Sequence, residues 1–178
     1  LSEQVSQDIK VVQSGQGADE LFGGYFWYPQ MQAAQGSALQ RFAPFYFDRD
    51  FDEYARTVNS RHVHEDYTSQ LVTEALHSCQ ADSHIDAVLH FDVTTLIVDD
   101  PVKRVDSMTM AWGLEARVPF LDHGLVELAM AMPATMKLAS EGKHVLKEIS
   151  RGLLPDSVID RPKGYFPMPA LKYVRGEF

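Results

Sequence analysis

The sequence predicts an α/β chain that is mostly helical, with one parallel strand near residues 9–13 followed by about six helices. Three patterns indicate this fold class. A short apolar run precedes a glycine-rich turn, apolar residues recur at spacings of three and four after residue 83, and prolines and glycines lie at the ends of these segments. One strand followed by helices is typical of the helical back half of a nucleotide-binding α/β domain, separated from its sheet.

The first element is the apolar run at residues 9–12, which has the composition of a buried parallel strand. The next turn contains Gly15 and Gly17, and glycine lets the backbone turn sharply and approach a ligand closely. Asp19 and Glu20 fall where a helix would begin, and a carboxylate there is stabilised by the helix dipole and can also coordinate Mg²⁺. These features suit a metal-bound phosphate group, and a purely structural glycine turn is the alternative.

Residues 26–60 are rich in aromatic side chains and are predicted to be irregular, because prolines interrupt them. Several of these rings are expected to pack into a core, since large aromatic side chains mainly bury area, and a surface that stacks on a substrate is the alternative. They are Phe42, Phe45, Tyr46, Phe47, Phe51 and Tyr54.

From residue 83 the pattern is helical. Ser83 is a candidate N-cap, and Pro101 is predicted to mark either a break or a helix start. The residues at helical spacing are Ile85, Val88, Leu89, Asp92, Leu96 and Ile97.

Two later helices are predicted over residues 125–132, closed by Pro133, and over residues 143–151, closed by Gly152. The chain from Pro155 onward is rich in proline and is therefore predicted to be extended.

The composition excludes several classes of function. A formal net charge of −9 argues against nucleic-acid binding, which usually requires a basic surface, although a few placed cations suffice for ATP. No apolar run approaches the ~20 residues that a membrane span requires, and no signal segment opens the chain. The single cysteine excludes an internal disulfide and suits a reducing cytoplasm. Because the chain begins at Leu1 in the middle of a pattern, we expect it to be a fragment of a longer protein.

Three sequence blocks carry a family resemblance. They are Gly-x-Gly-Ala-Asp-Glu at residues 15–20, Glu-Ala-Arg-Val-Pro-Phe-Leu-Asp at residues 115–122, and Arg-Pro-Lys-x-x-Phe at residues 161–166. In this order they resemble the synthetase domain of glutamine-hydrolysing asparagine synthase. The proline-rich ending at residues 162–173 is most similar to one branch, the N-acetylglutaminylglutamine amidotransferases, which make a dipeptide amide used as an osmoprotectant.

The resemblance implies a fold and a reaction. The fold is the mostly helical C-terminal part of an adenine-nucleotide α-hydrolase-like (PP-loop ATP pyrophosphatase) domain, with residues 1–178 forming a partial synthetase domain. In the reaction, ATP adenylates a carboxylate and releases pyrophosphate, and ammonia then attacks the acyl-adenylate to give an amide. The acceptor would be aspartate or N-acetylglutaminylglutamine, the ammonia would come from an upstream glutaminase domain, and the ligase would be cytoplasmic. A homodimer is left open.

The charge on the reacting phosphates calls for Mg²⁺ and fixed cations. The resemblance implies that Asp19 coordinates Mg²⁺, with a helix N-cap as the alternative. Backbone N–H groups near Gly15 and Gly17 can meet phosphate oxygens. Gln16 departs from the family, whose asparagine-forming members usually carry Glu there. A neutral amide cannot act as a base but can form hydrogen bonds to a substrate, so either proton removal takes place elsewhere or the acceptor differs from aspartate.

Lys163 is the strongest catalytic candidate, because the family's lysine in this late loop contacts the α-phosphate and stabilises the transition state. On composition alone a solvated loop lysine is the alternative. The resemblance also places a phosphate or substrate cation at Arg117, whose planar fork matches phosphate oxygens. Glu115 and Asp122 could instead bind Arg117 and fix the loop.

A basic pair, Lys103 and Arg104, precedes this block and matches family cations that contact phosphate or substrate. Arg104 is taken as catalytic and Lys103 as a binding residue. Asp100 and Asp106 flank the pair; Asp100 is assigned to substrate binding, and neutralisation of Arg104 is the alternative.

Two family features lie outside these 178 residues: the ATP-binding Ser-Gly-Gly loop and the N-terminal cysteine that hydrolyses glutamine. Both are expected upstream, so this fragment alone is expected to be inactive. One rival function is an intramolecular cyclase similar to β-lactam synthetases, and an upstream cysteine after the start methionine would count against it. The other is a nucleotide-binding regulator without turnover. Retention of Asp19, Arg117 and Lys163 counts against it, whereas Gln16 favours it.

Overall fold

The computed structural model describes residues 1–162, and Lys163 lies outside the described residues. The chain divides into two compact units, Leu1–Leu146 and Lys147–Phe178. The first unit is mostly helical with a two-stranded parallel sheet, in agreement with the predicted fold class. Among the described residues, no helix has both the length and the apolar character that a bilayer crossing requires.

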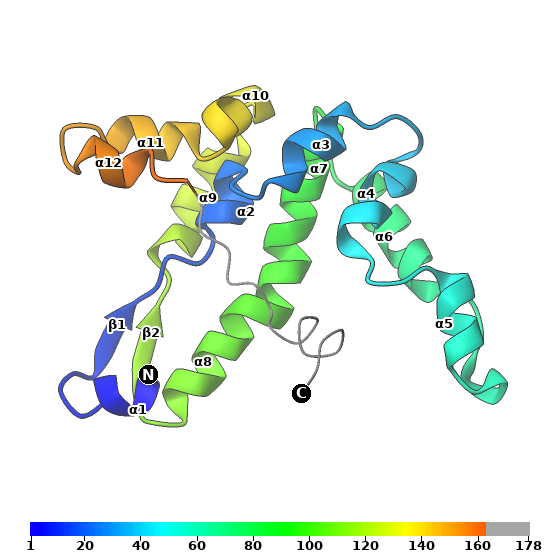
Figure 1. The fold of residues 1–178 in the computed structure, drawn as a ribbon, viewed down its shortest axis with the longest axis horizontal. Coiled ribbons are helices and arrows are strands. Elements are labelled where there is room, and N and C mark those ends of the chain that lie inside the picture. The colour runs from blue at the N-terminus through cyan, green and yellow to red at the C-terminus, as the bar shows by residue number, and fades with distance from the viewer. Residues whose placement is uncertain (163–178) are drawn as a thin grey trace, which may run out of the picture. The chain divides into compact units, whose positions relative to one another are not determined.

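The sheet pairs β1 (Val11–Gln13) with β2 (Glu115–Arg117) in parallel, as Figure 1 shows. The strand near residues 9–13 is confirmed, whereas the second strand was not predicted, because three residues of mixed polarity carry no strand pattern of their own. Burial of the first strand was predicted wrongly: Val11 is 41% exposed and Ile9 is 47% exposed. Among the described residues the sheet contains only these two strands, so most of its surface remains uncovered.

The prediction that residues 26–60 are irregular is wrong, because this segment contains three α-helices and the start of a 3₁₀ turn. Pro29 lies in the first turn of its helix, where proline is tolerated. The second helix begins with a reciprocal capping box between Ser37 and Gln40, a local signal that outweighs Pro44 near its end. The elements are α3 (Trp27–Ala33), α4 (Ala38–Tyr46), α5 (Phe51–Thr57) and η1 (Ser60–His62); α1 (Ser2–Val5) and α2 (Ala18–Phe22) precede them, and α6 (Tyr67–Ser78) follows.

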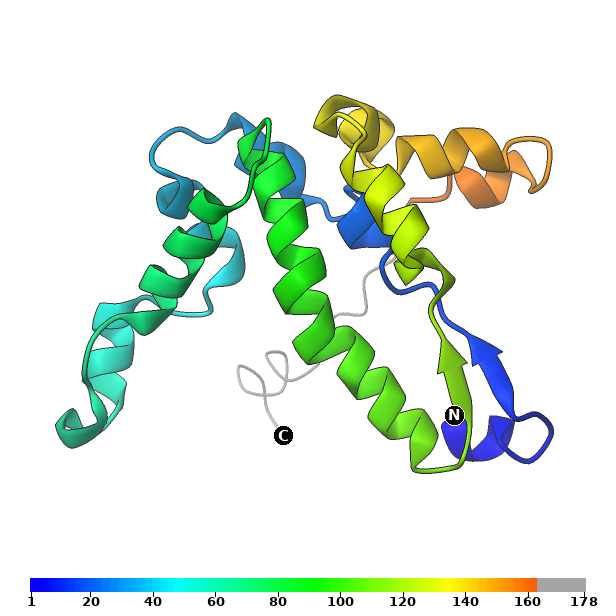
Figure 2. The same ribbon diagram turned by 180° about the vertical axis from the view of Figure 1, so that it is seen from behind.

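One long helical run crosses the first unit, drawn in green in Figures 1 and 2. It joins α7 (His84–Phe91) to α8 (Lys103–Met110) through two π-helical segments, η2 (Asp92–Leu96) and η3 (Val98–Val102). Ser83 caps the run as predicted, since its side chain accepts a hydrogen bond from the backbone N–H of Asp86. Pro101 neither breaks nor starts a helix. It lies inside η3, and π-helical geometry accommodates a residue that lacks an N–H.

The last part of the first unit contains η4 (Pro119–Leu121), α9 (His123–Met130), α10 (Ala134–Leu138) and η5 (Ala139–Glu141). The following helix α11 (His144–Ser150) continues into the second unit. The helices predicted before Pro133 and before Gly152 are both confirmed, and Gly152 has the positive φ of a helix stop.

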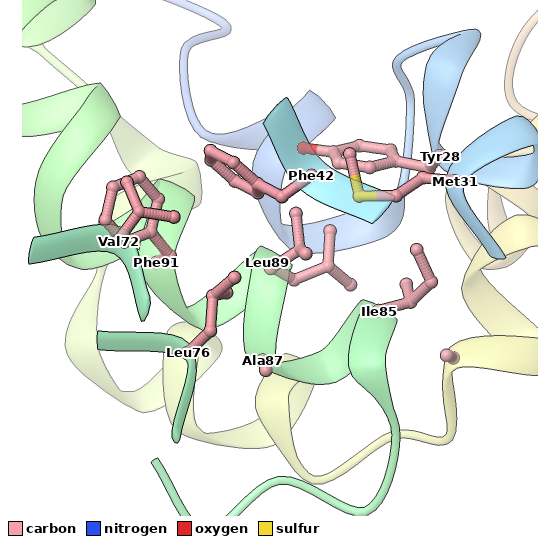
Figure 3. Close-up of a cluster of buried hydrophobic side chains, with 11 residues drawn as sticks. Tyr28, Met31, Phe42, Val72, Leu76, Ile85, Ala87, Leu89 and Phe91 are labelled. Carbon is pink, nitrogen blue, oxygen red and sulfur yellow. The ribbon is translucent and has the colours of Figure 1, made fainter. Parts of the chain in front are cut away.

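The main core gathers α3, α4 and α6 around α7 (Figure 3). Phe42 is buried and stacks on Tyr46 at 4.1 Å between ring centroids, and Phe45 and Phe47 pack against the same cluster. These predictions are confirmed. Phe51 and Tyr54 were predicted wrongly: they do not belong to this cluster, and their rings pack on each other within α5, with Tyr54 37% exposed.

A second cluster positions the glycine turn. Leu21 and Phe22 of α2 are buried against Ala129 of α9. Phe120 and Leu121 cover them from the following block, with the Phe22 and Phe120 rings edge to face at 6.4 Å. The helix after the turn is therefore fixed by packing against segments about a hundred residues later in the chain.

A buried carboxylate contacts two tyrosines of the main core. Asp92 is fully buried, and its Oδ2 accepts hydrogen bonds from the hydroxyls of Tyr28 at 2.6 Å and Tyr46 at 2.5 Å. The pKa of Asp92 is raised to about 7, mainly because burial disfavours the charged form; the two tyrosine hydrogen bonds oppose this shift, and the nearby charge of Glu20 adds to it. The other oxygen, Oδ1, has no hydrogen-bond partner among the described residues.

In the second unit, α12 (Asp156–Ile159) follows a tight turn. Residues 156–159 were predicted to be extended, but Pro155 lies at the N-cap, where proline starts a helix rather than preventing one. Arg151 joins this unit by ion pairs to Glu148, Asp156 and Asp160.

Candidate functional site at the glycine turn

The glycine turn leaves β1 at its carboxyl end, as predicted. Gly17 has φ 94° and forms the N-cap of α2, and a Cβ there would overlap the side chain of Leu121. A Cβ on Gly15 would meet nothing within 4 Å, so the turn is packed on the Gly17 side and open above Gly15. The hydroxyl of Ser14 donates to Gln16 Oε1 at 2.7 Å, which fixes the Gln16 side chain along the turn.

Arg117 lies at the same end of the sheet. It is the register partner of Gln13, and its carbonyl accepts the N–H of Ser14 at 2.8 Å. The parallel pairing thus brings the first two sequence blocks together. The Arg117 side chain is 62% exposed, and its Nε donates to Glu115 at 2.8 Å. Asp122 does not bind Arg117 but caps α9 through the N–H groups of Gly124 and Leu125.

The two acidic residues after the turn have different roles. Glu20 is 3% exposed, and one of its oxygens accepts the Tyr25 hydroxyl at 2.6 Å, so it is an internal group. Asp19 is partly exposed, and its Oδ2 lies 2.9 Å from the Lys143 ammonium nitrogen. Gly17 holds the N-cap, so Asp19 is not the capping residue. Of the pair, Asp19 is therefore the carboxylate that a solvent-borne ligand can reach.

Lys143 is a functional candidate that the sequence did not reveal. The chain before it takes a left-handed conformation at consecutive residues, with φ 53° at Ser140, 63° at Glu141, 89° at Gly142 and 55° at Lys143. For non-glycine residues such strain costs on the order of 1 kcal/mol each. The N–H of Lys143 donates to the carbonyl of Phe22 at 2.8 Å, which anchors the strained segment on α2.

Two glycines make this docking fit. A Cβ on Gly142 would overlap the carbonyl of Gly23, and a Cβ on Gly24 would overlap both Lys143 Cε and Asp19 Oδ1. Because neither glycine has a side chain, the Lys143 side chain can pass over the backbone of Gly24, just after α2, and reach Asp19.

Three further predicted residues, Asp100, Lys103 and Arg104, lie on the long helical run. Arg104 donates to Asp100 at 3.0 Å, within one helical turn, and both side chains are more than half exposed. This geometry matches the alternative in which Asp100 neutralises Arg104. Lys103 begins α8 beside this pair.

The donor set fits a nucleotide-borne Mg²⁺ better than a resident metal. No group of three or more histidine, cysteine or acidic side chains that could enclose a metal occurs within residues 1–162. Mg²⁺ on a nucleotide needs only one or two carboxylates, because phosphates and water complete its octahedron. Asp19 beside an open glycine turn supplies such a ligand.

Comparison with known proteins shows the family of this chain. The family model described as asparagine synthase matches residues 1–178. The chain belongs to the asparagine synthase family. The synthetase domains of this family have the adenine-nucleotide α-hydrolase-like fold. The family carries out ATP-dependent amide formation and uses Mg²⁺.

The similar proteins are glutamine-hydrolysing asparagine synthetases. Identity is 27% to asparagine synthetase 1 of Bacillus subtilis, over 99% of this chain and 33% of that protein. It is 29% to asparagine synthetase 3 of the same species, over 92% of the chain and 27% of that protein. It is also 29% to asparagine synthetase B of Escherichia coli, over 89% of the chain and 20% of that protein. The chain thus spans a third or less of the length of these curated relatives.

Proposed function

We propose that this chain is the C-terminal part of a synthetase domain that forms an amide from a carboxylate, ATP and glutamine-derived ammonia. The observation that supports this most strongly is that the parallel pairing brings the Arg117 backbone to the same sheet end as an open glycine turn, which the accessible carboxylate of Asp19 follows. Ligands bind outside the carboxyl ends of parallel strands in open α/β sheets, and this end is the carboxyl end.

The chemistry proceeds in two steps. A carboxylate oxygen of the acceptor attacks the α-phosphorus of ATP, the bond to the β-phosphate oxygen breaks, and pyrophosphate leaves. Ammonia then attacks the acyl carbon, AMP leaves, and a proton is lost from nitrogen to give the amide. Both steps place negative charge on phosphate oxygens, so fixed donors aimed at those oxygens lower the barrier.

Each candidate residue has a role in this proposal. The N–H groups around Gly15 and Gly17 bind phosphate oxygens, and Asp19 would hold the Mg²⁺. When bound, Mg²⁺ would neutralise charge on the pyrophosphate. Arg117 and Lys163 supply cations to the reacting phosphate.

Two further roles concern the long helical run and the acceptor. Arg104, Lys103 and Asp100 bind substrate or phosphate from the helical run. Gln16, held by Ser14, contacts the acceptor without acting as a base. This neutral residue favours N-acetylglutaminylglutamine over aspartate as the acceptor.

The proposal includes the rest of the protein. The ATP loop and the glutaminase would be supplied by a preceding segment, so the isolated 178 residues would be inactive. We place the enzyme in the cytoplasm, where a protein with a free cysteine such as Cys79 is kept reduced.

The decisive test uses the full-length protein. Pyrophosphate release is measured with ATP, Mg²⁺ and either aspartate or N-acetylglutaminylglutamine, with ammonia or glutamine as nitrogen donor. Release that depends on a carboxylate, with AMP and amide formed in equal amounts, is expected. Nucleotide binding without any carboxylate-dependent release would indicate a regulator, and release without need for ammonia would indicate a cyclase. Preference for aspartate would remove the specialised-acceptor part of the proposal.

A further inference from the structure

The ion pair between Lys143 and Asp19 occupies the carboxylate that the proposed reaction needs. The ammonium lies 2.9 Å from Asp19 Oδ2, with the side chains 30% and 23% exposed, respectively. An ammonium and a metal ion compete for the same carboxylate oxygen, because each neutralises the negative charge of that oxygen and occupies its lone pair. A divalent cation that binds Asp19 Oδ2 must therefore displace Lys143.

The position of Lys143 is built into the backbone. Lys143 ends a run of four residues with positive φ, and its N–H donates to the carbonyl of Phe22. Its side chain passes over Gly24, where the missing side chain leaves room for it. An ordinary surface ion pair needs none of these features, and strained backbone of this kind persists where the surrounding structure enforces it, often at ligand clamps. The fold thus places this cation against this carboxylate.

We infer that Lys143 is an exchangeable counterion of Asp19 that makes metal binding conditional on nucleotide. This inference rests on the proposed function in taking Asp19 as the metal ligand. Without nucleotide, Lys143 occupies the carboxylate and free Mg²⁺ binds weakly. When the metal arrives with a triphosphate or pyrophosphate, Asp19 passes to the metal and the ammonium compensates phosphate charge instead.

The direction of the coupling follows from the charges. A metal ion that binds alone displaces the Lys143 ammonium from Asp19 and leaves two cations, the ammonium and the metal ion, side by side. When the metal ion binds together with pyrophosphate, the displaced ammonium can instead pair with the negative charge of the pyrophosphate. Metal and pyrophosphate therefore strengthen each other's binding through Lys143, and by linkage this coupling is reciprocal.

The test measures binding rather than turnover. Mn²⁺ serves as the probe, and its affinity for the full-length protein is measured by calorimetry or electron paramagnetic resonance, with and without pyrophosphate. Lys143→Met is expected to bind Mn²⁺ alone about tenfold more tightly than the unmodified protein and to lose a similar factor of the enhancement by pyrophosphate. Lys143→Arg, which retains the charge, is expected to keep weak metal-only binding. Lys10→Met, which removes an exposed lysine of the same unit, is the matched control and is expected to change neither quantity.

A second variant covers the case in which Lys143→Met does not fold. Lys143→Gln removes the charge but keeps a polar side chain, and it is expected to raise Mn²⁺-only affinity in the same direction. Unchanged metal-only affinity in a folded Lys143→Met, or in folded Lys143→Gln, overturns the inference even if the enzyme releases pyrophosphate normally. Absence of carboxylate-dependent pyrophosphate release in the unmodified enzyme overturns the proposed function instead. Metal binding that survives Asp19→Asn overturns the inference and the metal role of Asp19, but not the proposed reaction.

Discussion

Asp19 and Asp92 are both engaged carboxylates, but their surroundings assign them opposite roles. Asp92 is fully buried, its partners are the neutral hydroxyls of Tyr28 and Tyr46, and its pKa is raised to about 7. Asp19 is partly exposed, and its partner is the Lys143 cation. A buried acid with neutral partners serves the fold and resists ionisation, whereas an accessible carboxylate with a cationic partner can exchange that partner for another cation.

The largest expected effect is on catalysis at the accessible carboxylate. Asp19→Asn in the full-length protein is expected to lower the rate of pyrophosphate release by ~10²–10³, because the metal-bearing charge is lost. Thermal unfolding is expected to change little, since the side chain is not in a core. Asp8→Asn, at an exposed position in the same unit, is the control. Normal turnover in Asp19→Asn would remove this residue from the site.

The next effect is on stability at the buried carboxylate. Asp92→Ala leaves the buried Tyr28 hydroxyl and the partly buried Tyr46 hydroxyl without their shared acceptor and opens a cavity, so it is expected to lower the free energy of unfolding by about 2–4 kcal/mol. Asp92→Asn, which retains an acceptor oxygen, is expected to lose less. Denaturant unfolding of both variants measures the difference. Equal losses would show that volume, and not the hydrogen bonds, stabilises this region.

The raised pKa of Asp92 predicts a pH dependence with a definite sign. In the unfolded chain this carboxyl has its ordinary pKa of 3.8, whereas in the folded chain its pKa is raised to about 7. Its stabilising contribution is therefore complete below pH 4, declines as the pH rises toward 7, and stays lost above it. Each unit of pKa separation corresponds to about 1.4 kcal/mol.

Unfolding measured across pH 4–8 tests this sign. The unmodified protein is expected to lose more stability with rising pH than Asp92→Asn does, because the amide has no proton to lose. Parallel curves for the two proteins would show that Asp92 is ionised in the fold.

The smallest expected effect concerns a third carboxylate. Asp100 and Arg104 form an exposed pair on one helical turn, so Asp100→Asn is expected to change the free energy of unfolding by less than about 0.5 kcal/mol. A clear fall in pyrophosphate release in this variant, measured beside the stability, would favour a substrate-binding role. Unchanged release would leave Asp100 as a counterion of Arg104.

Local sequence patterns predicted those parts of the molecule whose causes are local. The strand at residues 11–13, the turn at its carboxyl end and the Ser83 cap all follow from short patterns of apolar, glycine and hydroxyl residues. The capping box at Ser37 is also local, and attention to it would have placed α4 despite Pro44. Pro29 and Pro44 lie within helices and Pro155 precedes one, so proline does not exclude helix at these positions.

The missed features depend on distant partners. β2 is a strand only because β1 is beside it, and Glu20 is internal only because Tyr25 and the packing of α2 enclose it. Lys143 reaches Asp19 through a loop that docks on Gly23 and Gly24, over a hundred residues earlier in the chain. No pattern within a window of residues near Lys143 contains this information. Lys163, which the sequence ranks first among catalytic candidates, remains a prediction.

The three-residue pairing of β1 with β2 also has a kinetic consequence. It joins segments about a hundred residues apart, and closing such a long loop is entropically unfavourable until the intervening helices have formed. The helices can nucleate locally, but the glycine turn is held in place only after β2, which follows α8, pairs with β1. We expect the end of the sheet that carries the glycine turn to be among the last parts to assemble. A mutation in the intervening helices can then delay assembly of this candidate site without contacting it.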